Sequence, residues 1–467
     1  MPDEPTPLDP DHWAARLAAL AERHGVPGAQ LGICRLGPGG AEETVAVAHG
    51  VLDIATGHPV GPRSAFQIGS ISKVWTATAV LGLAEEGLLA LDTPVAEVLP
   101  ELVPSADATT AEVTVRHLLV HTSGIDGDLF TDTGRGDDAI ERYVAPLADA
   151  VRVHPLGATF SYCNSGFVLL GRIIERLTGR VWDEAMRERL FAPLGLERTG
   201  TLPEHALLHD PAVGHVEGLP DPVRTVQWGL PRAMGPAGGI TADVGDVLRL
   251  AALHLRGGTT ADGVRLLSRD TVRAMAQEQV RLPDPHTLGD SWGLGWIRYD
   301  WDGHRAIGHD GNTIGQSAFL RLLPGAGLAV ALLTNGGRTR DLYQDLYREV
   351  FDALAGVRVP DPLEPPADPP QVPDPRPGVY ESAGGRLEVL AGADGPVLRS
   401  TALGPLAELR PDPVEEHPLA AVAPGVYATR PEGTLTWSPV TFYRLENGQE
   451  YAHRNGRALP RVDSPAV

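Results

Sequence analysis

A dense run of proline divides this chain into two parts. Nine prolines stand among the 18 residues from Pro360 to Pro377. Because proline fixes φ and lacks an amide hydrogen, such a run forms neither a helix nor a central strand and behaves as a semi-rigid spacer. The sequence therefore predicts one domain over residues 1–358, a linker over 359–377 and a second domain over 378–467.

The first part has strand-like sequence at both ends and helical sequence between them. Alternating, β-branched stretches predict strands at residues 29–36, 43–51, 293–299, 316–323 and 328–334. Apolar periodicity with cap and stop residues predicts helices at residues 10–24, 74–86, 167–177, 241–255 and 342–354. We expect an α/β (α+β) domain, in which an antiparallel sheet built from N- and C-terminal pieces is flanked by helices with a helical insertion.

The second part is a succession of short strands with turn signals. The triplet Gly-Val-Tyr recurs at residues 378–380 and 425–427. Roughly eight strands within about 90 residues predict a small antiparallel β-barrel.

Charge and composition limit the partners. The net charge of −21 argues against nucleic acid and anionic membrane surfaces, both of which select basic proteins. The first residues lack the basic and apolar regions of a signal peptide, which predicts a cytoplasmic protein. Two cysteines make no disulfide framework, and no His-Glu-x-x-His pattern occurs, so we expect neither a metal nor another cofactor. The oligomeric state is left open.

Lysine occurs once in the chain, at Lys73, although lysine and arginine together number 39. A buried ammonium can lose its proton whereas a guanidinium cannot, so a lone lysine hints at acid–base chemistry. It lies in Ser70-Ile71-Ser72-Lys73, and Ser-x-x-Lys is a serine-nucleophile pattern. A helix that begins beside Ser70 would place Lys73 one turn later on the same face.

Two further short motifs follow along the chain. Tyr162-Cys163-Asn164 stands just before a predicted helix, and His309-Asp310-Gly311 stands at a strand that begins a hairpin. Each is weak alone. Cys163 is interpreted as a packing residue, because no base is assigned to it.

The order of the three motifs resembles that of the penicillin-recognising serine enzymes: class C β-lactamases, D-alanyl-D-alanine carboxypeptidases, D-aminopeptidases and related esterases. The phrases His121-Thr122-Ser123-Gly124, Gly238-Gly239-Ile240-Thr241 and Gly293-Leu294-Gly295-Trp296 also look like that family's. The resemblance covers residues 10 to 355, and the tail resembles a lipocalin-like barrel that some members append.

The resemblance implies five catalytic residues. Ser70 would be the nucleophile, and Lys73, if desolvated and neutral, its base. Tyr162 would share the proton and deliver it to the leaving group, while Asn164 would hold Lys73 and orient the substrate amide. His309, the first residue of the third motif, is the fifth catalytic residue that the resemblance implies.

The oxyanion hole implied by the resemblance consists of the backbone N–H groups of Ser70 and Asn312. Gly311 and Asn312 would bind the substrate backbone along an edge strand. His309 stands where secreted β-lactamases carry lysine, which puts β-lactamase activity in doubt, and Asp310 is expected to make the site less positive still.

The segment of residues 127–138 is acidic and glycine-rich and predicts a surface loop or lid. Asp126, Asp128 and Asp132 are interpreted as solvated, with contact to a substrate amine as the alternative.

These features predict an enzyme that forms an acyl-Ser70 intermediate from a peptide-like (thio)ester or amide. One interpretation, by resemblance to stand-alone penicillin-binding-protein-type thioesterases, is transfer of an acyl group ending in a D-residue to an amine, which would release and cyclise a nonribosomal peptide. The donor would be a small peptide-like molecule, either free or bound to a carrier protein. The alternative is a hydrolytic D-aminopeptidase, esterase or β-lactamase-related enzyme, and the least favoured is a non-catalytic binding protein on this scaffold.

Overall fold

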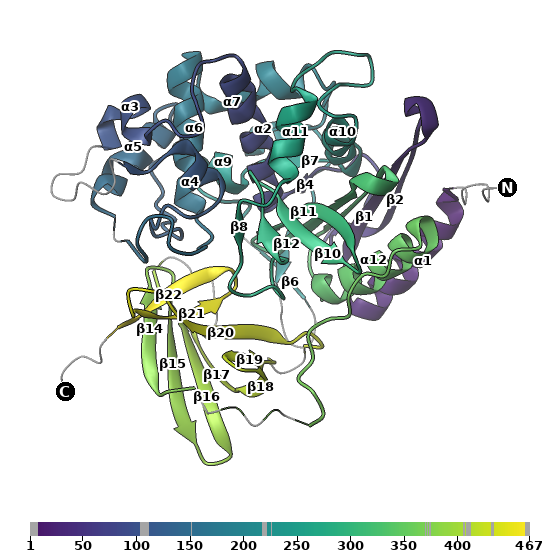
Figure 1. Cartoon of the computed structure of the whole chain (residues 1–467). Helices are drawn as coiled ribbons and strands as arrows, with labels where there is room; N and C mark the ends of the chain where they lie inside the picture. The colour runs from purple at the N-terminus through teal and green to yellow at the C-terminus, as the bar shows by residue number, and fades with distance from the viewer. Residues whose placement is uncertain are drawn as a thin grey trace.

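The computed structural model describes residues 8–102, 112–150, 152–216, 222–225, 227–368, 370, 372, 375–404, 407, 412–430 and 434–462. Within them lie a large sheet with helices on both faces and a second sheet curved into a barrel (Figure 1).

The large sheet has nine antiparallel strands and joins the two ends of the first part of the chain. Its spatial order is β3-β2-β1-β13-β12-β11-β10-β9-β8. The strands are β1 Gly28–Leu36, β2 Glu42–Asp53, β3 His58–Pro59, β8 Val280–Arg281, β9 Ser291–Trp292, β10 Ile297–Trp301, β11 His304–Thr313, β12 Gln316–Leu323 and β13 Leu328–Thr334. The pairing of β1 with β13, which sets Ile33 opposite Val330, confirms the predicted sheet of N- and C-terminal pieces.

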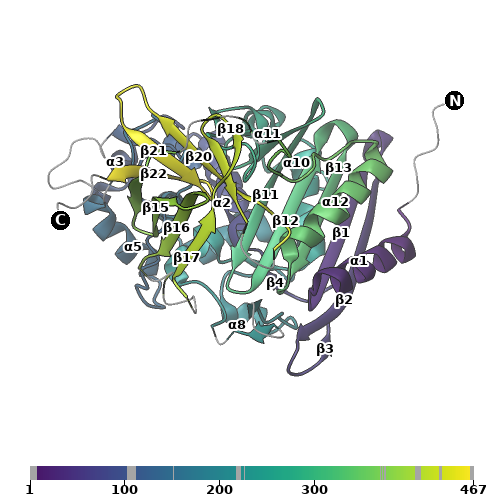
Figure 2. The same cartoon turned by 90° about the horizontal axis from the view of Figure 1, so that it is seen from below.

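Two helices cover one face of this sheet, α1 Pro10–His24 and α12 Thr339–Ala355. Asp9 caps α1 by accepting a hydrogen bond from Asp11 N, and Gly25 ends it with φ of 62°. Trp13, Leu17 and Leu20 pack with strand residues and with α12, as the periodicity of the sequence predicts. Figure 2 shows the two helices side by side.

The other face carries the helical insertion. Its helices are α2 Ser72–Glu85, α3 Val95–Val98, α4 Val115–Leu119, α5 Ala139–Val144, α6 Asn164–Thr178, α7 Trp182–Met186, α8 Pro203–Ala206, α9 Gly235–Gly238, α10 Val244–Leu255 and α11 Arg269–Ala276. Short strand pairs join β4 Phe66–Gln67 to β7 Thr241–Ala242, and β5 His215–Val216 to β6 Val223–Arg224. Helical turns of other types lie at η1 Pro38–Gly40, η2 Gly69–Ile71, η3 Pro100–Leu102, η5 Ala145–Asp149, η6 Arg187–Phe191, η7 Arg232–Met234 and η8 Pro324–Ala326.

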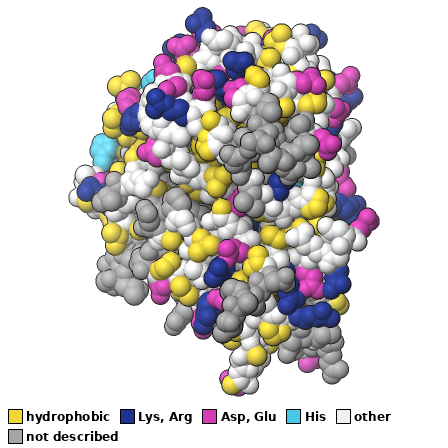
Figure 3. Space-filling view, turned by 90° about the vertical axis from the view of Figure 1, so that its left-hand side faces the viewer, with side chains coloured by type: hydrophobic (Ala, Val, Ile, Leu, Met, Phe, Trp, Pro, Cys, Tyr) yellow, Lys and Arg dark blue, Asp and Glu magenta, His cyan; other side chains and the backbone are white. Residues whose placement is uncertain are grey.

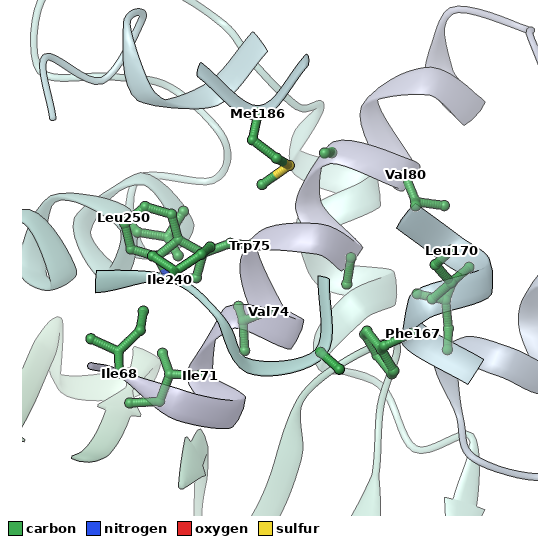
Figure 4. Close-up of a cluster of buried hydrophobic side chains, with 14 of the residues drawn as sticks. Ile68, Ile71, Val74, Trp75, Val80, Phe167, Leu170, Met186, Ile240 and Leu250 are labelled. Atoms are coloured by element: carbon green, nitrogen blue, oxygen red, sulfur yellow. The ribbon is translucent and has the colours of Figure 1, made fainter. Parts of the chain in front are cut away.

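Helix α2 is enclosed by this layer. Val74, Trp75 and Val80 point from it in different directions, and Phe167 and Leu170 of α6 pack against it (Figure 4). Residues 72–81 of α2 are buried on every side, including the polar residues Ser72, Lys73 and Thr76, so this part of the helix presents no face to water. The segment that carries Ser70 and Lys73 is therefore fixed by packing.

The C-terminal sheet is a nearly closed antiparallel barrel of nine strands, in the order β17-β16-β15-β14-β22-β21-β20-β19-β18. They are β14 Gly378–Ser382, β15 Gly385–Gly392, β16 Gly395–Ala402, β17 Val414–Pro418, β18 Ala420–Ala423, β19 Val426–Thr429, β20 Ser438–Arg444, β21 Glu450–Arg454 and β22 Arg457–Val462. Tyr380, Leu398, Tyr427 and Leu459 form part of its own apolar core. The predicted barrel is confirmed; the domain boundaries stay a prediction.

Two sequence expectations about elements are wrong. Residues 293–299 are not one strand, because a turn at Gly293–Trp296 separates β9 from β10 and Gly295 adopts φ of 84°. The helix expected over residues 241–255, with Thr241 or Asp243 near its cap, begins at Val244, since Asp243 is the cap and accepts from Asp246 N, while Thr241 pairs with Gln67. Both errors come from turn chemistry that apolar content does not reveal.

Acidic and basic side chains are interspersed on the face in Figure 3. Among the described residues, no helix is both long enough and apolar enough to span a membrane.

Candidate active site

The site lies where the N-terminus of α2 meets the end of β11. Ser70 is in the turn η2 immediately before α2 and is half-buried, while Lys73 on the first turn of α2 is completely buried. Lys73 Nζ lies 2.9 Å from Ser70 Oγ. The predicted juxtaposition of amine and hydroxyl is present in the structure.

The hydrogen bonds of Lys73 determine which way its lone pair points. Nζ donates to Asn164 Oδ1 at 2.8 Å and to the Ala237 carbonyl at 2.5 Å. A neutral amine has two N–H groups and one lone pair, and both of these oxygens can only accept. The lone pair is then left to receive the Ser70 hydroxyl proton.

Asn164 is oriented by a chain of contacts that begins in the barrel. Its Nδ2 donates to Asp128 Oδ1 at 3.0 Å, which leaves Oδ1 for Lys73. Asp128 in turn accepts two hydrogen bonds from Arg457, one from Nε and one from Nη2, both at 3.0 Å. Arg457 is the first residue of β22, so the C-terminal barrel reaches the site.

Tyr162 lies between these groups. Lys73 Nζ and Arg457 Cζ each lie 4.8 Å from the centroid of its ring, and His121 stacks on it with centroids 4.5 Å apart. Its hydroxyl is hydrogen-bonded to Ser70. Ser70 is thus in contact with both the amine and the phenol.

Burial shifts the pKa values of Lys73 and Tyr162 in opposite directions. Burial lowers the pKa of Lys73 well below its ordinary value, the Arg457 cation lowers it further, and Asp128 opposes both. Burial also raises the pKa of Tyr162, which keeps the phenol protonated. The environment therefore favours the neutral form of the amine, a proton acceptor, and the neutral form of the phenol, a proton donor.

Strand β11 presents opposite side chains to its two faces. His309 and Gly311 point toward Ser70, whereas Asp310 points to the α12 face, where it lies 2.6 Å from Arg321 Nη1 and 2.7 Å from Arg340 Nη1. These cations lower the pKa of Asp310 to about 2. The expectation that Asp310 makes the site less positive is wrong, because two arginines compensate its charge on the other face of the sheet.

The open edge of β11 provides the second predicted oxyanion donor. Strand β10 pairs with β11 only as far as Gly308, so among the described residues no strand pairs with residues 309–313 on that side. Because the β11–β12 hairpin turns over two residues, Thr313 and Gln316 form its hydrogen-bonded pair, and the N–H of Asn312 faces away from β12.

Two glycines allow this edge to approach Ser70. A Cβ on Gly69 would lie 2.5 Å from Asn312 N, and a Cβ on Gly311 would lie 1.9 Å from Ile68 O and 3.0 Å from Ser70 N. The N–H groups of Ser70 and Asn312 are therefore brought together by positions that admit no side chain. Gly69 also adopts φ of 51°, which favours glycine.

The acidic segment is only partly what the sequence predicts. Asp132 is exposed, as expected. Asp126 is buried and its Oδ2 accepts from Ala383 N at 2.7 Å, and Asp128 pairs with Arg457. The interpretation of Asp126 and Asp128 as solvated is wrong, because the barrel covers this segment.

The sequence analysis did not identify Arg457 or its ion pair with Asp128. Arg457 is one of 38 arginines and stands in an ordinary Asn455-Gly456-Arg457 turn, so no local pattern marks it. Cys163, by contrast, matches its interpretation as a packed thiol, since it is buried and its Sγ caps α6 by accepting from Gly166 N.

Known proteins share both the sequence and the architecture of this chain. Residues 13–355 match the family model "Beta-lactamase". Penicillin-binding protein 4 of Amycolatopsis lactamdurans is 44% identical over 81% of this chain and 99% of its own length, and esterase EstB of Burkholderia gladioli is 31% identical over 70% and 92%.

Among solved structures, SurE superposes with a TM-score of 0.77 and 28% identity, covering 97% of this chain and 98% of its own, so the likeness includes the barrel. The family match covers most of the large domain and the motifs around Ser70. The chain therefore belongs to the β-lactamase family, the serine hydrolases of the β-lactamase fold.

Proposed function

We propose that this protein is an acyl-transferring serine enzyme that forms an ester on Ser70 from a peptide-like donor and passes the acyl group to an amine. The observation that carries the chemistry is the set of contacts around Lys73, whose two N–H groups have acceptors and whose remaining position faces Ser70 Oγ.

In the acylation step, Lys73 takes the proton of Ser70 as the hydroxyl oxygen attacks the donor carbonyl. The N–H groups of Ser70 and Asn312 stabilise the oxyanion that develops. Tyr162 then gives its proton to the leaving group and is reprotonated from Lys73, with Ser70 Oγ now part of the ester. Each proton moves between groups that the site already holds together.

The burial that lowers the pKa of Lys73 favours its neutral form, so the proposed scheme uses it as the base and includes no metal or other cofactor. Asn164, Asp128 and Arg457 act on this step indirectly. They hold the amine in place and fix its orientation.

A peptide-like donor is supported by the open edge of β11. An extended substrate can add to residues 309–313 as a further strand. The cavity of about 730 Å³ between β11, α12 and the barrel is lined by Asp310 and Arg340 and lies on the other side of β11 from Ser70, so it carries no argument about the donor.

A D-residue in the acyl group, and transfer to an amine rather than to water, are the finer parts of the proposal. SurE has been solved with D-Leu, and this chain shares its two-part architecture. His309 replaces the lysine that the resemblance associates with β-lactamases, so the site lacks that fixed cation for a substrate carboxylate. We propose macrocyclisation and release of a nonribosomal peptide from a carrier, in the cytoplasm, as the corresponding role.

The second candidate is plain hydrolysis, as in a D-aminopeptidase or an esterase. The 31% identity to esterase EstB favours it, because the same acyl-enzyme can be released by water. A non-catalytic binding protein is the least favoured, since Ser70, Lys73, Tyr162 and Asn164 form one connected set.

The test uses matched peptidyl thioesters that end in a D- or an L-residue and carry a free N-terminal amine. We expect a cyclic product, formed faster from the D-ended donor, with no turnover and no covalent adduct in Ser70→Ala. Linear acid as the sole product would make the hydrolase the better assignment, and an adduct that persists in Ser70→Ala would overturn the nucleophile.

A further inference from the structure

A cavity of about 730 Å³ lies behind β11, on the face of that strand opposite Ser70. Strands β10 to β12 and helix α12 form one wall, and residues 359–363 of the linker and 434–439 of the barrel form the other. Its volume lies within the range of sites for small-molecule ligands. Both folded parts and the segment that joins them therefore border one space, which the chemistry at Ser70 does not use.

The inner wall of this cavity carries an excess of positive charge. Arg321 Nη1 lies 2.6 Å from one oxygen of Asp310, and Arg340 Nη1 lies 2.7 Å from the other. Among the described residues, no other carboxylate forms an ion pair with either arginine. Both guanidinium groups keep their protons, so the cluster has one positive charge that Asp310 does not balance. Arg340 is 35% exposed and presents that charge to the cavity.

Two buried donors beside this cluster have no acceptor. Arg321 Nε and the hydroxyl of Tyr299 have no hydrogen-bond partner within the described part of the chain. The Arg321 Cζ atom lies 4.4 Å from the centroid of the Tyr299 ring, so the two groups are neighbours, and both residues line the cavity. Burial raises the pKa of Tyr299 well above its ordinary value, which keeps its O–H available to donate. A ligand that supplies acceptor oxygens and negative charge would satisfy this wall.

Much of the remaining lining is aromatic. Trp301, Phe319 and Tyr343 belong to the sheet and α12, and Trp437 belongs to the barrel. The Arg340 Cζ atom lies 5.3 Å from the centroid of the Tyr343 ring. Aromatic surface beside a guanidinium suits a ligand with an anionic end and a flat apolar body, because an inorganic anion would leave the rings uncovered.

We propose that this cavity is a second binding site, which takes a small organic carboxylate with an aromatic ring. Arg340 binds the carboxylate beside Asp310, and the ring of the ligand lies between the aromatic side chains of the two folded parts. This inference goes beyond the proposed function, since it holds whether the acyl group on Ser70 passes to an amine or to water.

A ligand in this position connects the barrel to the strand that borders Ser70. Asn312 of β11 and Arg457 of β22 also line the cavity. A molecule that binds the folded chain across both parts stabilises their packed arrangement against unfolding. We therefore expect the ligand to raise the thermal midpoint of the protein without competing with acylation of Ser70.

The first experiment titrates the full chain with three probes and measures heat. The probes are 3-phenylpropanoate, the neutral 3-phenylpropanamide and acetate, which separate the contributions of charge and ring. We expect the aromatic acid to bind at least about tenfold more tightly than the other two, as one charge-assisted hydrogen bond implies. A fourth probe, N-acetyl-D-phenylalanine, shows by its relative affinity whether a peptide end or a simple acid fits better.

The second experiment locates the site with variants of the full chain. Arg340→Gln removes the charge and should weaken binding of 3-phenylpropanoate at least about tenfold and abolish its effect on the thermal midpoint. Arg16→Gln is the matched control, because Arg16 also bonds to a carboxylate of α12, Glu349, but lies outside the cavity lining. Its affinity should equal that of wild type. Trp437→Ala, on the barrel wall, tests the same site if Arg340→Gln does not fold.

The third measurement separates this cavity from the cleft at Ser70. Protein that carries a fluorophosphonate adduct on Ser70 should bind 3-phenylpropanoate as tightly as the unlabelled protein.

Equal affinity for the acid and its amide, or no binding of the acid, overturns the site. Binding that persists in both Arg340→Gln and Trp437→Ala, or that disappears in the Ser70 adduct, places the probe elsewhere and overturns it as well. None of these results bears on the proposed function, which is tested by the products released from Ser70.

Discussion

Lys73 combines complete burial with two accepting oxygens, which is the arrangement that a base needs and a fixed cation does not. Burial stabilises the neutral form, and Asn164 and Ala237 occupy both of its N–H groups. A lysine with a purely electrostatic role would not be expected at a fully buried position, because loss of water destabilises its charged form.

Replacing Lys73 by arginine tests this distinction. We expect Lys73→Arg to acylate nearly as slowly as Lys73→Ala, because a guanidinium keeps its proton at neutral pH. Burst kinetics with a chromogenic ester measure the rate. A residual rate above about a tenth of wild type, a loss below about 1.4 kcal/mol, would make Lys73 a charge.

The control addresses fit, since the arginine fork is larger than an amine. Small primary amines added to Lys73→Ala should restore part of the rate, and guanidine at the same concentration should not. Equal rescue by both compounds would contradict the role of a free base.

At the scale of elements, β11 performs two separate tasks because successive side chains face opposite ways. Its odd-numbered residues at the site, His309 and Gly311, border Ser70, while Asp310 joins β11 to Arg321 on β12 and to Arg340 on α12. The ion pairs on one face thus hold the strand whose open edge carries the predicted oxyanion donor, the N–H of Asn312.

Gly311→Ala should disturb the approach of β11 to Ser70 and leave the ion pairs of Asp310 in place. The new Cβ would lie 1.9 Å from a backbone oxygen, so the strand and η2 must move apart. Loss of one oxyanion donor lowers the acylation rate by about 100-fold or more. Circular dichroism and thermal melting check that the fold persists.

The matched control is Gly325→Ala in the β12–β13 turn, where a Cβ would meet nothing within 4 Å. We expect its acylation rate to equal that of wild type. Comparable losses in both variants would argue against a specific role for the close approach of β11.

Several elements follow from local sequence, and two do not. The ends of α1 are marked by Asp9, Pro10 and Gly25, which act through neighbouring backbone groups and can be recognised in sequence. The break between β9 and β10 and the start of α10 depend on a positive φ and on pairing with a distant strand. Such features are set by tertiary contacts.

At the scale of the whole molecule, the barrel is part of the active site. It approaches the segment of residues 126–162 through Ala383, Gly456 and Ala458, whose backbone groups bond to Asp126, Tyr162 and Ser161. The proline-rich segment separates the two parts in sequence, but the folded parts pack together.

The charges of Arg457 and Asp128 should shift the pH profile in opposite directions. Activity requires neutral Lys73, so the rate falls as pH drops through its pKa. Arg457 lowers this pKa and Asp128 raises it. Arg457→Gln should move the acid limb of kcat/KM to higher pH, and Asp128→Asn should move it to lower pH.

Arg399→Gln is the matched control, because Arg399 bonds to Glu416 within the barrel. It should leave the profile unchanged. Shifts in the same direction for Arg457→Gln and Asp128→Asn would show that both act by loosening the structure.

We expect that removing residues 361–467 lowers the reactivity of the Ser70 hydroxyl. Without the barrel, Asp128 loses Arg457, and Lys73 and Tyr162 become accessible to water, which raises the pKa of the amine toward its ordinary value. We expect labelling by a fluorophosphonate probe to slow at least about tenfold. A folded truncated protein that is labelled at the full rate would show that the barrel serves only larger substrates.

The sequence by itself determined the class of fold, which rests on periodicity and on cap and breaker residues that act over short stretches of chain. Ser70, Lys73, Tyr162, Asn164 and His309 were predicted as the site through the resemblance of the three motifs to a known family. Only the tertiary structure decided that Asp128 and Arg457, 329 residues apart, meet beside Lys73. It also decided that Asp310 faces away from the site, toward Arg321 and Arg340. The physical reason is that charge pairing, desolvation and hydrogen-bond direction depend on which surfaces are brought together, and that information is spread over the whole chain.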